Sequence, residues 1–170
     1  MRSHIAISLL LAIVTVAGVP PARCAERNGL AFAMTTDKRN YKVGEPVRVS
    51  FTWTNVGVTT LVIPNWRGPT EGVTGSGEGE SAIRDFAVYY EGKEMVGYRG
   101  VFACGVAPEL SLESKRTVTH SYEINDVYSL SRTGRYVLRS AYFGYAPNDR
   151  ALNHWRGEIV HPDVEIWIHE

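Results

Sequence analysis

The stretch that decides the fold reads Tyr41-Lys-Val-Gly-Glu-Pro-Val-Arg-Val-Ser-Phe-Thr-Trp-Thr-Asn55. After the turn signal Gly44-Glu45-Pro46, apolar and polar residues alternate up to a second turn signal, Asn55-Val56-Gly57. Side chains on a β-strand point alternately to its two faces, so the pattern predicts a strand with one buried and one solvated face. The predicted buried face carries Val47, Val49, Phe51 and Trp53, and the solvated face carries Arg48, Ser50, Thr52 and Thr54.

Similar short alternating runs, separated by turn residues, fill the rest of the chain. Pro64 ends one of them, Glu91-Gly92-Lys93 forms the tight turn of a hairpin, and Trp167 lies opposite the apolar face of the last run. About eight strands at this spacing, with no amphipathic helix, predict an all-β fold, specifically an immunoglobulin-like Greek-key β-sandwich of about 7–9 strands. Besides the organising strand, the predicted strands are Leu30–Met34, Thr60–Ile63, Ile83–Tyr90, Met95–Tyr98, Lys115–Ile124, Arg135–Phe143 and Val164–Ile168.

The first 25 residues have the features of a secretory signal peptide. Arg2 precedes an apolar run from Ile5 to Val19, and small residues follow Pro20-Pro21. A run of about 15 apolar residues is short for a membrane anchor, which needs about 20. We therefore expect cleavage after residue 25, a secreted or periplasmic domain over residues 26–170, and no membrane span in the mature chain.

The charge balance limits the classes of partner. The chain has 18 basic and 18 acidic residues, and a mature chain without Arg2 and Arg23 would have a formal net charge of −2. Nucleic acid is therefore not expected as a partner, because phosphate binding needs a basic surface. Cleavage after Ala25 leaves Cys104 as a single buried thiol, whereas earlier cleavage would keep Cys24 and allow a disulfide in an oxidising compartment.

No catalytic, cofactor or metal motif emerges from the residues. The Gly-rich acidic segment 70–81 has neither the dinucleotide-binding spacing nor the lysine of a phosphate-binding loop. His154 and His161 could share a metal with Asp163 or Asp149, but surface histidines in polar loops are far commoner. No Ser, Thr or Cys lies in a nucleophile context. We expect no enzyme activity and no cofactor.

The order of several core and turn residues resembles a known family. Tyr41-x-x-Gly-Glu-Pro-Val47 with Asn55-x-Gly57 resembles the opening of bacterial extracytoplasmic immunoglobulin-like domains and, more loosely, of the intracellular proteinase inhibitor family. Asp85–Val88, Thr119–Tyr122 and Tyr128-Ser-Leu-x-x-x-Gly134-x-Tyr136 resemble the N-terminal, non-catalytic domain of deuterolysin-type peptidyl-Lys metalloendopeptidases. The zinc-binding His-Glu-x-x-His of those enzymes is absent, so the resemblance implies an accessory domain without the protease.

These patterns leave two functional hypotheses. The first is a protein-interaction module, in its sharpest form a regulator of a peptidase that presents the loops 66–81 and 99–108. The alternative is a carbohydrate-binding or envelope-associated module whose aromatic platform would include Trp66, Tyr142, Tyr145 and Trp155. The candidate contacts for either partner are Trp66, Lys93, Arg99, Tyr145 and Trp155.

Overall fold

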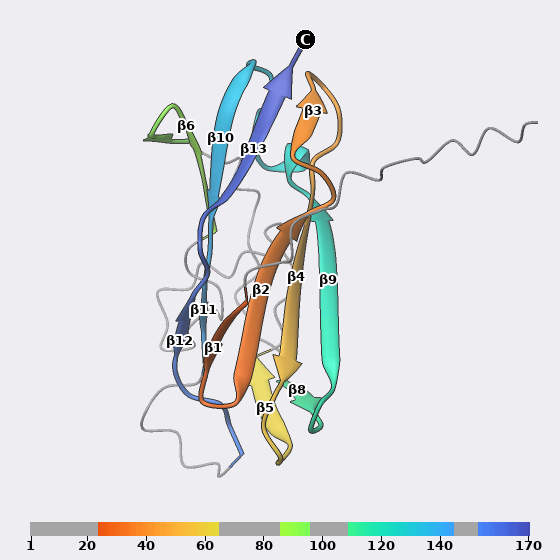
Figure 1. The fold of residues 1–170 in the computed structure, drawn as a ribbon, viewed down its shortest axis with the longest axis vertical. Coiled ribbons are helices and arrows are strands. Elements are labelled where there is room, and N and C mark those ends of the chain that lie inside the picture. The colour runs from red at the N-terminus through yellow and green to blue at the C-terminus, as the bar shows by residue number, and fades with distance from the viewer. Residues whose placement is uncertain (1–23, 65–85, 96–108, 145–152) are drawn as a thin grey trace, which may run out of the picture.

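A computed structural model describes residues 24–64, 86–95, 109–144 and 153–170, which form a β-sandwich (Figure 1). Apart from one turn of 3-10 helix at Ile124–Asp126, every regular element in these ranges is a strand. The strands are β1 (Ala25–Arg27), β2 (Leu30–Thr36), β3 (Asn40–Lys42), β4 (Arg48–Asn55), β5 (Leu61–Pro64), β6 (Ala87–Tyr90), β7 (Lys93–Glu94), β8 (Glu109–Leu112), β9 (Thr117–Glu123), β10 (Gly134–Arg139), β11 (Ala141–Phe143), β12 (Glu158–Val160) and β13 (Val164–His169).

Two sheets form the layers of the sandwich. The first has the strand order β1-β2-β4-β9 with antiparallel pairing throughout, and the second has the order β3-β13-β10-β6-β7. The pairs β11–β12 and β5–β8 form two smaller sheets. Figure 1 shows β11 and β12 continuing the second layer below β10 and β13. The predicted all-β sandwich is thus confirmed, while its Greek-key connectivity stays a prediction.

The alternation predicted for the organising strand is confirmed. Val49, Phe51 and Trp53 of β4 are buried, while Arg48 is exposed and the intervening hydroxyl residues are half-buried. The buried side chains face an aromatic core to which both layers contribute. The Phe32 ring lies 5.5 Å from the ring centroids of both Trp53 and Tyr142.

Several element boundaries differ from the sequence-based expectation, and the described ranges alone contain thirteen strands rather than about eight. The turn predicted at Gly44-Glu45-Pro46 is confirmed, with Gly44 at a φ of 81°, but the residues before it form a separate strand, β3, in the other sheet from β4. The expected strand 135–143 is also split, because β10 and β11 pair with different partners on either side of Ser140. Thus a continuous alternating run can serve two sheets when the chain crosses between layers.

Two short elements correct the prediction at the lower end of the sandwich. Residues 109–112, which lie outside the predicted strands, form β8 and pair with β5. Pro64 was predicted to follow this strand. It is instead the last residue of β5, and it pairs with Glu109. A proline is tolerated there because the end of a short edge strand does not require its missing N–H donor.

The hairpin predicted at Glu91-Gly92 is confirmed. Tyr90 pairs with Lys93 across a two-residue turn, and Glu91 and Gly92 have φ angles of 49° and 78°. Positive φ at both central residues is the geometry that a type I′ turn requires. The predicted signal peptide over residues 1–25, the segment 70–81 and Cys104 lie wholly or almost wholly outside the described residues. Within the described ranges no helix is long and apolar enough to cross a membrane.

Candidate functional site

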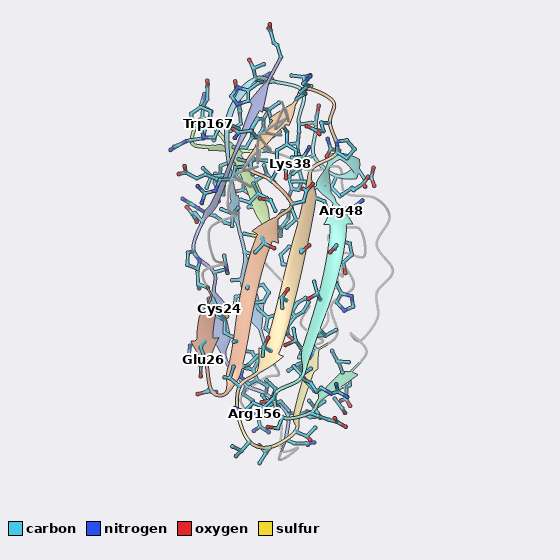
Figure 2. All side chains as sticks on the ribbon, turned by 45° about the vertical axis from the view of Figure 1, so that its right-hand side comes forward. Cys24, Glu26, Lys38, Arg48, Arg156 and Trp167 are labelled. Carbon is cyan, nitrogen blue, oxygen red and sulfur yellow. The ribbon has the colours of Figure 1, made fainter. Side chains whose placement is uncertain are left out.

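The outward face of the second sheet carries large side chains of the kinds that bind partners. Trp167 projects from β13 with 45% of its surface exposed, on the side of the sandwich away from β4 and β9 (Figure 2). Its cross-strand neighbours in the register are Asn40 on β3 and Arg135 on β10. We call this surface the Trp167 face, and it consists of Asn40, Tyr89, Arg135, Arg139, Asp163, Glu165, Trp167 and His169.

Backbone periodicity explains why these side chains point outward. Along β13, Ile166 and Ile168 are buried while Glu165 and Trp167 are exposed. A strand places every second side chain on the same face, so burial of the isoleucines forces Trp167 outward. The backbone N–H of Trp167 donates to the carbonyl of Arg39 at 2.7 Å, which holds β13 in its register beside β3.

Ion pairs hold the charged members of the face in place. The Arg139 Nε lies 3.1 Å from both carboxylate oxygens of Asp163, and the guanidinium lies 4.5 Å from the centroid of the Tyr89 ring. The hydrogen bond with Asp163 raises the pKa of Arg139, which therefore stays charged. The Arg135 Nη1 lies 3.3 Å from the Glu165 Oε1. Each of these two arginines is thus paired with a carboxylate on the same face.

A concave surface lies at the β6–β7 hairpin. It is an open groove of about 380 Å³, and Lys93 is one of its lining residues. The guanidinium of Arg132 lies 5.7 Å from the Tyr90 ring centroid, and the Tyr90 hydroxyl donates to the carbonyl of Thr133 at 3.0 Å. Tyr136 lines the groove on the side of the core. Burial raises the pKa of its hydroxyl group. The groove therefore combines aromatic and apolar side chains with charges of both signs on its rim.

The structure places two of the five predicted contact residues. Lys93 is exposed on β7 and lines the groove. Trp155 is 2% exposed: its ring stacks on Tyr142 at 5.6 Å and its indole N–H donates to the carbonyl of Arg27 at 3.1 Å. This corrects the expectation of a surface contact, since a ring enclosed on all sides offers no face to a sugar. Trp66, Arg99 and Tyr145 lie outside the described residues.

The histidines occupy separate environments. His154 lies 3.3 Å from a Glu109 oxygen, whereas His161 is buried, with its Nδ1 2.6 Å from the carbonyl of Pro162. His120 is half-buried and edge-on to Trp53 at 5.7 Å, as its position on the inner face of β9 predicts. Across the described ranges, no group of three His, Cys, Asp or Glu side chains is arranged to hold a metal ion.

A scan against protein-family models and a search of curated proteins find no match for this chain. The resemblance to the accessory domain of deuterolysin-type peptidases therefore stays a prediction.

Trp167 is the functional candidate that the contact predictions did not include. Its signal was nevertheless visible in the sequence, as a large aromatic residue out of phase with Val164, Ile166 and Ile168. An out-of-phase tryptophan on an alternating strand has to face solvent unless another layer covers it. Its cross-strand neighbours, Asn40 and Arg135, come from strands distant in the chain, so the local pattern could not predict them.

Proposed function

We propose that this protein is a secreted or periplasmic, non-enzymatic immunoglobulin-like module that binds a partner protein through the Trp167 face. The partner that we propose first is a peptidase, which the module would regulate. The single observation that carries the proposal is the half-exposed indole of Trp167 on β13, between β3 and β10 of the five-stranded sheet.

The composition of the face supports a protein partner. Trp, Tyr and Arg are the residue types that dominate binding energy in protein interfaces, because they combine a large contact area with hydrogen-bonding capacity. Trp167, Tyr89, Arg135 and Arg139 all lie on this one face. The salt bridges to Asp163 and Glu165 hold the arginines in place, which reduces the conformational entropy lost on binding.

The same indole supports a second candidate function, the binding of a glycan. A sugar ring stacks on an exposed aromatic face, and Asn40 beside Trp167 offers an amide for hydrogen bonds to hydroxyl groups. We place the protein partner first because Tyr89, Arg135 and Arg139 share the face with Trp167, and these residue types are enriched at protein interfaces.

Affinity capture tests the proposal. The full chain with a C-terminal tag on a long flexible linker is used to capture partners from the extracytoplasmic fraction of the producing organism. A peptidase is expected at near-stoichiometric yield. Trp167→Ala is expected to weaken its binding about 30-fold or more in a titration, which corresponds to a hot-spot loss of about 2 kcal/mol.

Val58→Ala is the matched control, because Val58 is an exposed apolar side chain in the β4–β5 turn, away from the Trp167 face. It should bind as the wild type does. Retention on polysaccharide that Trp167→Ala abolishes would replace the protein partner with a glycan. A partner bound equally well by Trp167→Ala would exclude this face.

A further inference from the structure

The edges of the two sheets differ in how they are protected. Exposed edge strands can pair with another chain, and proteins prevent this with short strands, charges, prolines or bulges. Three of the sheet edges follow that rule: β1 and β3 have three residues each, β7 has two, and all three carry charged residues. These residues are Glu26, Arg27, Lys42, Lys93 and Glu94.

The fourth edge strand, β9, has none of these devices along most of its length. It has seven residues, and the six from Thr117 to Tyr122 include no Asp, Glu, Lys, Arg or Pro. Its register with β4 runs without a bulge from Thr117 to Glu123. Within the described ranges β4 is its sheet neighbour, and β9 ends the strand order (Figure 1).

The hydrogen-bond pattern identifies the backbone groups that face outward. Asn55 donates to the carbonyl of Arg116, and Ile124 donates to that of Val47, so the even-numbered residues of β9 point toward β4. In an antiparallel pair the alternate residues point the other way. The N–H and C=O groups of Thr117, Thr119, Ser121 and Glu123 therefore line the outer edge.

This edge is complementary to itself. An antiparallel pair of β9 strands with its two-fold axis at His120 places Thr119 opposite Ser121 of the partner subunit, and Thr117 opposite the partner's Glu123. All four positions then form bonded pairs, with about eight backbone hydrogen bonds in total. Lys115, two residues before Thr117, becomes the diagonal neighbour of the partner's Glu123, so the ends of the pair have opposite charges.

The side chains on the solvated face fit the same arrangement. Hydroxyl groups already pair across β4 and β9, at 2.8 Å for Ser50 and Ser121 and 3.0 Å for Thr52 and Thr119. A hydroxyl group donates once and accepts up to twice, so each group retains capacity for a further neighbour. A second β9 strand would continue this row with Thr119 facing Ser121 of the partner subunit.

From this geometry we propose that two copies of the protein associate through antiparallel pairing of β9, which joins their four-stranded sheets into one. The pairing does not use the Trp167 face and does not depend on the proposed function. A dimer in which the Trp167 faces remain accessible would present two copies of that surface.

Sedimentation of the full chain over a range of concentrations tests the association. The wild type is expected to reach twice the mass of the monomer. Thr119→Pro removes an N–H that points outward and leaves the ladder with β4 intact, so it should weaken the dimer about tenfold while circular dichroism shows a retained fold. Thr119→Val, which keeps the N–H and loses the same hydroxyl group, is the matched control and should dimerise.

The register has its own test. His120 lies on the proposed axis, where the two Cα atoms of a non-hydrogen-bonded pair are about 4.5 Å apart, a distance that a disulfide can span. In a chain with Cys24 and Cys104 replaced by Ser, His120→Cys should form a dimeric disulfide, and Thr117→Cys should not. A wild type that stays monomeric at every concentration, or a dimer that Thr119→Pro leaves unchanged, would overturn the proposal.

Discussion

The two outward faces of the sandwich are built by the same alternation but differ in what they offer a partner. On the first sheet, Ser50, Thr52 and Thr54 pair their hydroxyl groups with Ser121, Thr119 and Thr117 across the strands, at 2.8–3.0 Å. On the second sheet, Trp167 exposes an indole beside ion-paired arginines. These side chains of the first face are small, and their hydroxyl groups bond to one another across the strands. The second face exposes the large apolar ring of Trp167.

This difference underlies our proposal that the second face, and not the first, binds a partner. Small hydroxyl side chains have little apolar area. A partner that covers them therefore removes little apolar surface from water and gains little free energy. A tryptophan on a sheet face gains far more from being covered. We therefore propose that the first sheet pairs with a second copy of the chain through the backbone groups of β9. The second sheet would bind its partner through the Trp167 face.

The largest expected effect comes from a substitution in the hydrophobic core between the two sheets. Phe51 is fully buried and lies 6.2 Å from the ring centroid of Phe32. Phe51→Ala should lower the free energy of unfolding by about 3–5 kcal/mol, through lost burial and a cavity, as measured by urea denaturation. A cost below about 1 kcal/mol would contradict the inward facing of β4. Thr52→Ala, one residue along on the other face, is the control and should cost far less.

A smaller effect is the loss of stability at alkaline pH, which comes from buried tyrosines of the second sheet. Burial and the hydrogen bond to Asp37 raise the pKa of Tyr41, which lies on β3 in the second sheet. The unfolded chain loses this proton near pH 10 while the folded chain keeps it, so stability is full below pH 10 and falls above it. Each such tyrosine contributes a slope of about 1.4 kcal/mol per pH unit.

Tyr41→Phe should therefore flatten the decline of stability between about pH 10 and 11, relative to the wild type, in thermal unfolding. Tyr136 continues to contribute in that variant, because burial raises its pKa as well. An unchanged alkaline slope in Tyr41→Phe would show that the Tyr41 phenol ionises alike in both states.

The smallest expected effect measures the hydroxyl row itself. Thr52→Val removes the bond to Thr119 and keeps the β-branched shape, so it should lower the free energy of unfolding by about 0.2–1 kcal/mol. The loss should be the same at low and high salt, since neither hydroxyl group carries a charge. The Arg139–Asp163 pair on the opposite face should by contrast weaken as salt increases. A salt-dependent loss in Thr52→Val would mean that the row is coupled to charged groups.

Much of the fold could be predicted because alternation is a local property. The facing of β4, the hairpin at Glu91-Gly92 and the outward direction of Trp167 all follow from residues adjacent in the chain. The break at Ser140 was not predictable, because both halves of that strand alternate in the same way and only the partner strands change. Trp155 was misplaced for a related reason, since an isolated aromatic residue carries no periodic signal of its own.

The sequence by itself determined the all-β class and which face of each long strand is apolar, because the backbone imposes a period of two on every strand. Only the tertiary structure decided which strands become neighbours. That choice buries Trp155 against Tyr142, sets Asn40 and Arg135 beside Trp167, and leaves β9 at the end of its sheet. The physical reason is that sheet pairing joins residues more than a hundred positions apart in the chain, as with Asn40 and Trp167, and no local pattern encodes a contact of that range.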